Sequence, residues 1–333
     1  MNNIDQNFKN IGAVIGFYLL CFVTLLLSFR VPDASAAQNA DSENVILDTG
    51  SGELEGTLLV PNAEESQSVV LIIAGSGPTD RNGNQQMMMN NSLKYLAEEL
   101  ADLGIASLRF DKRGIAKSSA AMVNESELRF ETYIDDAAGW IAFLKEDQRF
   151  SDVVVAGHSE GSLIGMVAAR QAGASGFISI AGAGSSLDQV IRTQLQSQPA
   201  FVLEEALPIL DKLVEGEQVD EVSSMLQSLF RKSVQPYLIS QFRYQPTEKL
   251  QKLEIPVLIV QGTTDIQVEV GEAELLHEAL PEAKLKLFEG MNHVLKESPA
   301  DFQQNLATYN NPDLPLFPGL SEAIAGFIKS INF

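Results

Sequence analysis

The stretch VVVAGHSEG, from Val153 to Gly161, decides the fold that the sequence predicts. Its continuous apolar start is typical of a strand buried on both faces, and the segment SLIGMVAAR that follows is typical of a helix. The pattern G-x-S-x-G between them places Ser159 on a tight strand-to-helix turn. Gly157 and Gly161 remove side chains that would collide there. The turn therefore presents Ser159 as a candidate nucleophile, with the amides of the next helix aimed at negative charge that develops beside it.

Short apolar runs on both sides of this stretch predict the rest of a sheet. They are Val45–Leu47, Gly56–Val60, Val69–Ile73, Ser107–Phe110, Phe177–Ile180, Val257–Val260 and Leu285–Phe288. Apolar residues recur at helical spacing between several of these runs, as in Leu93–Leu100 and Ile134–Leu144. This alternation predicts an α/β fold, with a mostly parallel central sheet and helices on both of its faces. The turn TGSGE joins the first two runs, which we expect to form an antiparallel hairpin at the sheet edge.

Residues 185–250 interrupt the alternation, because they contain no strand pattern. They carry several short helical patterns and an acidic run that comprises Glu204, Glu205, Asp211, Glu215, Glu217, Asp220 and Glu221. A connection of this length inside a compact domain should have structure of its own. We interpret it as a helical lid over the carboxyl ends of the strands. The alternative is an additional helical subdomain that does not gate a site.

A serine at neutral pH is a weak nucleophile and needs a base that is itself oriented by a carboxylate. In a fold of this kind the chain order is serine, acid, histidine, and only His277 and His293 follow Ser159. His277 lies near the end of a helical pattern. The helix dipole favours a histidine at that position, so we interpret His277 as a surface residue. His293 lies on a loop that begins at Gly290, directly after the last predicted strand. Since such loops carry the reactive groups of open α/β sheets, we predict that His293 is the general base.

The acid should follow the preceding strand in the same way. The sequence PVLIVQGTTD ends in Asp265, three residues past a glycine, and we predict that Asp265 orients the histidine. Glu269 and Asp301 are alternatives, but neither lies at a strand exit. His158 precedes the serine, and we expect it to point off the opposite side of the turn, with a packing role rather than a role in proton transfer.

An oxyanion hole needs backbone N–H groups opposite the nucleophile. We expect one from Glu160, the residue after the serine. The other should come from the loop AGSGPTDRNGN, residues 74–84, where glycines allow the backbone to approach a ligand closely. Within it Ser76 is the first candidate donor and Gly77 the second. The alternative is a Gly-Pro turn with no catalytic part.

Composition and charge exclude several classes of protein. The chain has 333 residues, of which 45% are hydrophobic and 20% charged, as in a globular protein with a sizeable core. Its formal net charge of -21 argues against a nucleic-acid partner and against binding to an anionic membrane surface. With Cys21 as the single cysteine and three histidines, we expect no metal site. The sequence has neither G-x-x-x-x-G-K-[ST] nor G-x-G-x-x-G, so we expect no nucleotide cofactor.

The N-terminal segment resembles a signal for export. Ile11–Phe29 is an uncharged apolar run preceded by Lys9, and a small-residue pattern, Ala34-Ser35-Ala36, follows it. We predict a signal peptide over residues 1–36, and a periplasmic or secreted domain over residues 37–333 that includes the lid. The alternative is a retained membrane anchor, because the run reaches the lower length of a membrane-spanning helix. A membrane association is expected only in that case.

Several motifs together resemble the α/β-hydrolase superfamily. They are G-H-S-E-G, the acid and histidine at successive strand exits, and DKRGIAKS from Asp111 to Ser118. AGSGPTDRNGN and QGTTDIQV are similar to bacterial serine hydrolases described as serine-aminopeptidase-like or esterase-like, of the monoacylglycerol-lipase type. The resemblance covers residues 45–333. Members often have D-x-R-G-x-G-x-S, where this chain has Ala116 in place of the second glycine, and H-G where it has Ala74-Gly75.

The residues and the resemblance together imply a serine hydrolase that acts on small carboxylic esters with short or medium acyl chains. Ser159, His293 and Asp265 would form the catalytic triad of an acyl-enzyme mechanism, with no cofactor. A serine aminopeptidase or amidase that acts on small peptides is the first alternative. A non-catalytic, hydrolase-like binding protein is the second. No feature of the sequence predicts an oligomeric state.

Overall fold

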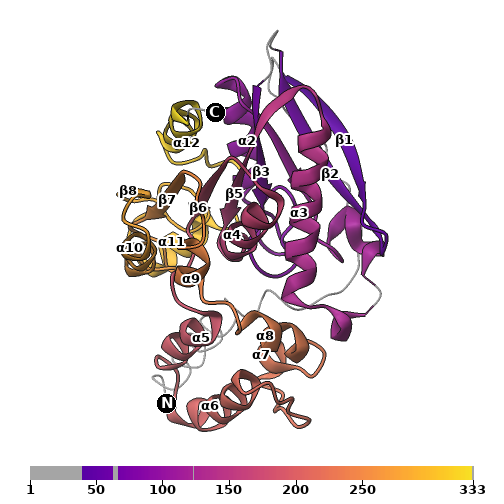
Figure 1. Cartoon of the computed structure of the whole chain (residues 1–333). Coiled ribbons are helices and arrows are strands. Elements are labelled where there is room, and N and C mark those ends of the chain that lie inside the picture. The colour runs from indigo at the N-terminus through magenta and orange to yellow at the C-terminus, as the bar shows by residue number, and fades with distance from the viewer. Residues whose placement is uncertain (1–39, 63–66, 123, 332–333) are drawn as a thin grey trace. The chain divides into compact units, whose positions relative to one another are not determined.

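The computed structural model describes residues 40–62, 67–122 and 124–331. This described part contains an eight-stranded sheet with the strand order β1-β2-β4-β3-β5-β6-β7-β8 (Figure 1). The strands are β1 (Ala40–Asp48), β2 (Glu53–Pro61), β3 (Gln67–Ile73), β4 (Ala106–Phe110), β5 (Phe150–His158), β6 (Gly176–Ile180), β7 (Val257–Gly262) and β8 (Lys284–Phe288). Every strand that the sequence predicts is present.

Six of these strands form a parallel sheet, and the first two extend it in antiparallel fashion. β1 pairs with β2 and β2 with β4 antiparallel, whereas the pairs from β4 through β3 to β8 are parallel. The predicted edge hairpin is confirmed, and its turn is closed by a hydrogen bond from Thr49 N–H to Gly52 O of 3.1 Å. Because parallel strands need crossover connections, the helices between them fall on the two faces of the sheet.

Helices cover both faces, as predicted for an α/β fold. On one face, α2 (Ser92–Asp102) and α12 (Leu320–Ser330) pack in a continuous apolar core with strand residues such as Ile72 and Ile178. On the other face, Gly165 of α4 (Glu160–Ala172) lies against Val155 and Phe177. The sheet unit also contains most of α3 (Phe130–Glu146), with α9 (Pro246–Leu250), α10 (Val270–Ala279), α11 (Phe302–Thr308) and the 3-10 turn η2 (Ala116–Ala121). The 3-10 turn η3 (Glu125–Glu127) belongs to the helical unit described next.

The described residues fall into two compact units. The sheet unit contains residues 40–62, 67–122, 132–185 and 245–331, and the helical unit contains residues 124–131 and 186–244. The helices of the latter are α5 (Leu187–Leu195), α6 (Ala200–Val214), α7 (Gln227–Phe230) and α8 (Gln235–Gln241). The segment 185–250 was predicted to be helical, and all the elements that the structure has there are helices. The last of them, α9, belongs to the sheet unit. Whether the helical unit acts as a lid stays a prediction.

A segment far away in the sequence completes the helical unit. The Arg231 guanidinium forms an ion pair with Glu125, with Nε 2.9 Å from Oε2. The amide of Phe130 donates to Ser240 Oγ at 2.8 Å, and the Phe130 ring meets the ring of Tyr237 edge-on. These contacts join residues more than a hundred positions apart, which explains why periodicity within 185–250 did not identify the segment.

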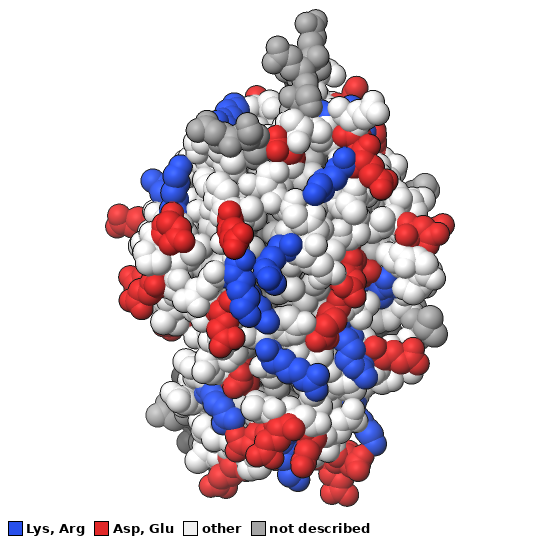
Figure 2. All heavy atoms as spheres, in the orientation of Figure 1, with Lys and Arg blue, Asp and Glu red and all other residues white. Residues whose placement is uncertain are grey.

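The predicted signal peptide, residues 1–36, lies outside the described residues. Within the part that the structure describes, no helix has the length and apolar character needed to cross a membrane. Figure 2 shows acidic and basic side chains intermixed on the face in view. On that face the net charge of -21 is therefore not expressed as a surface of one sign.

Candidate active site

Ser159 lies where β5 ends and α4 begins. Its backbone has φ 55° and ψ -122°, a combination that is uncommon for a residue with a side chain. A hydrogen bond of 2.9 Å from Ser159 N–H to Ile180 O on the neighbouring strand fixes this conformation. Such strain persists only where the surroundings enforce it, and it clusters at functional sites. The local structure is therefore the strand-to-helix turn that the sequence predicts.

The two glycines of the motif are required by close backbone approach. A Cβ atom on Gly157 would lie 2.1 Å from the carbonyl oxygen of Gly161. A Cβ atom on Gly161 would lie 2.4 Å from the carbonyl oxygen of Ile73 at the end of β3. Both distances are far below van der Waals contact, so any larger residue would push the turn out of shape. The G-x-S-x-G spacing is thus explained by packing against the neighbouring strand.

His293 and Asp265, predicted from separate strand exits, come together. His293 Nδ1 donates to Asp265 Oδ2 at 2.8 Å, and the two side chains are 5% and 0% exposed. The second carboxylate oxygen, Oδ1, accepts from the amides of Gln267 and Val268 at 2.8 and 2.9 Å. Gln261 Nε2 donates to Oδ2 at 3.1 Å. Because the carboxylate accepts a hydrogen bond from Nδ1–H, the proton of the neutral ring stays on Nδ1. Nε2 of His293 is then the basic nitrogen.

His158 supports this loop, in a way that the sequence analysis did not predict. Its Nε2 lies 2.8 Å from the carbonyl oxygen of His293, and the two ring centroids are 4.8 Å apart. The expectation that His158 points away from the catalytic side is therefore wrong. Burial, with the nearby His293 adding to it, lowers the pKa of His158 to about 3. The ring is neutral at ordinary pH, and since a carbonyl only accepts, Nε2 carries the proton and donates it.

His158, the neighbour of Ser159 in the chain, connects the serine turn to this pair through its contact with His293. Within the described residues no hydrogen bond joins the Ser159 hydroxyl to His293. Catalytic hydrogen bonds commonly tighten only when substrate binds. The other downstream histidine, His277, is half-buried in α10, and its Nδ1 has no hydrogen-bond partner among the described residues. Among the described residues, no hydrogen bond joins it to Ser159 or Asp265.

The loop proposed to supply an oxyanion donor passes directly against the nucleophile. A Cβ atom on Gly75 would lie 3.0 Å from Cβ of Ser159, so a side chain at this position would crowd the serine. Within the described part of the chain, the N–H groups of Ser76 and Gly77 have no hydrogen-bond acceptor. Glu160, the other predicted donor, is the first residue of α4. The structure therefore leaves both Ser76 and Gly77 as candidate donors.

Buried ion pairs hold the strand exits around Ser159. Arg81 Nη2, on the Gly75 loop, lies 2.7 Å from Asp111 Oδ2, and the Asp111 carboxylate also accepts from the amide of Arg81 at 2.8 Å. Arg113 Nη2 lies 2.6 Å from Asp136 Oδ1 on α3. These contacts explain why charged residues of the DKRG motif are buried at the end of β4. The motif is a structural frame next to the candidate site.

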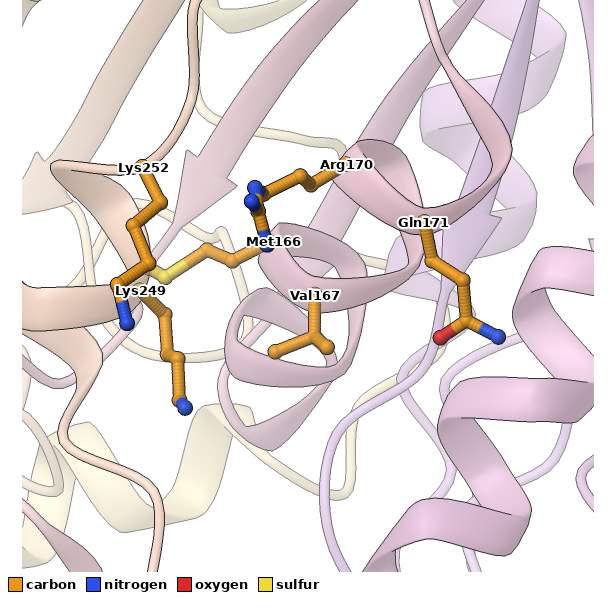
Figure 3. Close-up of a pocket in the computed structure, with 6 residues that line it drawn as sticks. All are labelled: Met166, Val167, Arg170, Gln171, Lys249 and Lys252. Carbon is orange, nitrogen blue, oxygen red and sulfur yellow. The ribbon is translucent and has the colours of Figure 1, made fainter.

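A surface pocket lies elsewhere on the sheet unit. It has a volume of about 460 Å³ and is lined by Met166, Val167, Arg170, Gln171, Lys249 and Lys252 (Figure 3). Its α4 residues come from the second half of the helix, whereas Ser159 is at the helix start. The pocket is therefore not the site of Ser159. Among the described residues, no group of three or more His, Cys, Asp and Glu side chains could hold a metal ion.

Comparisons with known proteins show what this chain is similar to. Residues 89–241 match the model of a family described as serine aminopeptidase, S33. Over 295 residues the chain is 25% identical to esterase EstD of Thermotoga maritima. That match covers 83% of this chain and 66% of the relative, so the chain spans just under two thirds of the relative's length.

Solved structures share the fold over most of the chain. Est1E from Butyrivibrio proteoclasticus, with ferulic acid bound, has a TM-score of 0.57 and 18% identity, and the match covers 86% of this chain and 98% of that one. Acylaminoacyl peptidase from Pyrococcus horikoshii also has a TM-score of 0.57, with 13% identity and coverage of 88% and 42%. At these identities the likeness shows a common fold.

Proposed function

We propose that the chain is an esterase-like serine hydrolase of the α/β-hydrolase superfamily, and that it cleaves carboxylic esters with a triad of Ser159, His293 and Asp265. The observation that carries the proposal is the buried His293–Asp265 pair of 2.8 Å beside a strained serine turn. A serine nucleophile, a histidine base and an orienting carboxylate are the set that acyl transfer needs. The esterase name of the Thermotoga maritima relative supports an ester as the substrate.

In the first half of the proposed reaction, Ser159 Oγ attacks the acyl carbon of the ester. His293 Nε2 accepts the hydroxyl proton, and the imidazolium that results is stabilised by the Asp265 carboxylate. The carbonyl oxygen becomes an oxyanion, which accepts hydrogen bonds from Glu160 N–H and from Ser76 N–H, with Gly77 N–H as the alternative donor. The ester bond then breaks, and His293 returns the proton to the leaving alcohol. An acyl-enzyme on Ser159 remains.

The second half uses the same groups with water as the nucleophile. His293 removes a proton from the water molecule, whose oxygen attacks the acyl carbon. The tetrahedral intermediate collapses, the acid leaves, and Ser159 Oγ regains its proton from the imidazolium. No metal ion or organic cofactor takes part in these steps, since the proton and charge transfers balance within the triad.

We propose further that the helical unit restricts the acyl group as a lid. It combines buried apolar residues such as Ile191 and Leu195 with the exposed Phe201. An apolar cover discriminates between acyl chains by about 1–3 kcal/mol per methylene. We therefore expect a preference for short or medium chains that decreases gradually with length.

A serine aminopeptidase is the second candidate, favoured by the family description of the match over residues 89–241. A peptidase that removes N-terminal residues needs a carboxylate near the α-amine of its substrate. The acidic residues of α6 and of the segment after it, among them Glu204, Glu215 and Glu217, would be the source of that group. Ester and amide substrates use the same triad, so only substrate profiling separates the two activities.

The test is a panel of p-nitrophenyl esters from acetate to palmitate, run beside aminoacyl-p-nitroanilides. The ester proposal predicts turnover of the short and medium esters, with kcat/KM for anilides lower by orders of magnitude. Ser159→Ala should abolish the ester activity, whereas Ser330→Ala, an exposed serine on α12, is the matched control and should leave it unchanged. Preferential turnover of the anilides would replace the esterase with the aminopeptidase. Activity that survives in Ser159→Ala would reject the triad.

We also propose that the chain is exported and cleaved after Ala36, because of the apolar run Ile11–Phe29 and the Ala34–Ala36 pattern. N-terminal sequencing of the protein from a bacterial expression host should begin at Ala37. A full-length chain that only detergent extracts would instead establish the membrane anchor.

A further inference from the structure

Lys112 is a buried cation at the candidate oxyanion hole. Its side chain is 2% exposed. In the chain, Lys112 follows Asp111, which is the first residue after β4. Nζ donates a hydrogen bond to the carbonyl oxygen of Gly75 and lies 3.5 Å from Oε2 of Glu160. The ammonium also lies over the ring of Tyr133, 5.2 Å from its centroid. One lysine therefore contacts both backbone segments from which the oxyanion donors are expected.

The contact with Gly75 acts on a candidate donor through one peptide group. The carbonyl of Gly75 and the N–H of Ser76 belong to the same planar unit, whose electrons are delocalised. A hydrogen bond from an ammonium to that carbonyl draws electron density from the nitrogen and strengthens the N–H as a donor. It also fixes the plane of the peptide, and thereby the direction in which Ser76 N–H points.

The contact with Glu160 removes an electrostatic obstacle. The Glu160 carboxylate is 10% exposed and belongs to the residue directly after the nucleophile. An unpaired carboxylate there would repel the negative charge of the tetrahedral intermediate in a poorly hydrated site. The ammonium of Lys112 neutralises that carboxylate while the backbone N–H of Glu160 remains directed by the start of α4.

We propose that Lys112 is a positioning residue of the oxyanion hole, which orients and polarises the Gly75–Ser76 peptide and neutralises Glu160. The inference rests on the proposed function and concerns the same site. Its effect is specific to the transition state, because the oxyanion carries a full charge only there. Loss of Lys112 should therefore lower kcat and leave KM nearly unchanged.

The experiment compares Lys112→Met with Lys112→Gln on the preferred p-nitrophenyl ester. Methionine fills the space without charge or donor, and we expect kcat to fall about 10- to 100-fold, less than for the loss of an oxyanion donor itself. Glutamine can still donate to Gly75 O but cannot neutralise Glu160. The decrease of kcat in Lys112→Gln should therefore be smaller than in Lys112→Met. Lys145→Met is the matched control, because Lys145 also donates to backbone carbonyls, at the far end of α4. It should retain the parent kcat.

A second readout distinguishes positioning from mere packing. Alkylboronic acids form a tetrahedral anionic adduct with a nucleophilic serine, so their inhibition constant should rise in Lys112→Met by about the same factor as kcat falls. Melting temperatures identify a variant that loses activity because it is unfolded. If Lys112→Met does not fold, Lys112→Gln still provides the test.

The outcomes also separate this inference from the proposed function. If Ser159→Ala is inactive but both Lys112 variants keep the parent kcat, Lys112 has no such role while the esterase stands. The same conclusion follows if the Lys112 variants raise KM and leave boronate inhibition unchanged. If Ser159→Ala stays active, the triad itself is wrong.

Discussion

The ion pairs around the candidate site in the sheet unit differ in burial from the ion pairs of the helical unit. Around the candidate site in the sheet unit, the paired side chains of Arg81–Asp111, Lys112–Glu160 and Arg113–Asp136 are at most 10% exposed. In the helical unit, the paired side chains of Arg192–Asp211, Arg231–Glu125 and Lys232–Asp220 are at least 20% exposed. Exposed pairs contribute little because water screens them, whereas a buried charge is costly unless its partner stays in place.

The difference shows which parts of the molecule are held in one geometry. Asp111, Lys112 and Arg113 are consecutive residues, and each is committed to a buried ion pair beside the strand exits. A displacement of any of them would leave a charge without compensation in a dry environment. Catalysis requires such fixed positions, because small misplacements of reacting groups reduce rates strongly. The helical unit, which we propose restricts substrates by apolar contact, has no comparable requirement.

The largest expected effect is the loss of a residue of the proposed triad in the sheet unit. Ser159→Ala and His293→Ala should each lower kcat by about three or more orders of magnitude, and Asp265→Asn should also lower it. His277→Ala, a half-buried histidine outside the candidate site, is the matched control and should be nearly silent. Steady-state kinetics on one ester checks all four. A silent His293→Ala together with an inactive His277→Ala would move the base to α10.

The ion pairs themselves provide the next test. Arg113→Met leaves Asp136 buried and unpaired and should lower the free energy of unfolding by about 3–5 kcal/mol. Arg192→Met removes the same kind of side chain from the exposed pair with Asp211. It should change the free energy of unfolding by less than about 1 kcal/mol. Urea unfolding of both variants measures the two values. Equal losses would remove the contrast between the two units.

A weaker effect is expected from the pH dependence of stability at His158. Its folded-state pKa, about 3, is below the ordinary value of 6.5 because the ring is buried. The unfolded chain therefore binds the extra proton between these values, and the stability that neutral His158 provides is lost as the pH falls from about 6.5 towards 3. His158→Gln keeps a donor for the His293 carbonyl but does not titrate.

Urea unfolding of the parent and of His158→Gln at pH 7 and pH 5 isolates this contribution. We expect the parent to lose more stability than the variant over that interval, since the other titrating groups are common to both. The same loss in the two proteins would mean that His158 is not held neutral by burial.

The sequence predicted the sheet unit well because its signals are local. The apolar runs predicted every strand of the described residues, and the turn around Ser159 is determined by glycines within the motif. The approach of His293 to Asp265 could be predicted from their positions at successive strand exits. What the sequence did not provide are contacts between distant residues. Lys112 reaches Gly75, and His158 reaches the carbonyl of His293, through side-chain directions that no periodicity encodes.

The helical unit shows the same limit more strongly. Its helices follow from apolar spacing, but the contribution of residues 124–131 depends on Arg231 and Ser240, which lie far along the chain. Apolar spacing also did not distinguish residues that form the interior from those that remain accessible. Phe230 is fully buried, whereas Phe201 is 53% exposed, although both fit the same pattern.

These two phenylalanines give the last and smallest prediction, which concerns the proposed lid. Phe230→Ala removes a buried ring and should cost about 3–5 kcal/mol of unfolding free energy, lowering the melting temperature. Phe201→Ala, on α6, should cost less than about 0.5 kcal/mol because the ring is largely exposed. If Phe201 packs on the acyl chain, each methylene that the ring shields from water is worth about 0.8 kcal/mol, or about fourfold in kcat/KM.

We therefore expect Phe201→Ala to lower kcat/KM for octanoate esters by a few-fold relative to acetate esters, with an unchanged melting temperature. Phe230→Ala should show the reverse, a lower melting temperature and the parent profile of acyl chains. The profile of Phe201→Ala is decisive, since folding cannot account for a change in a variant of parent stability. An unaltered ratio of octanoate to acetate turnover in Phe201→Ala would show that this exposed ring does not select the substrate. The proposal that the helical unit acts as a lid depends on this exposed ring, so that outcome would contradict it.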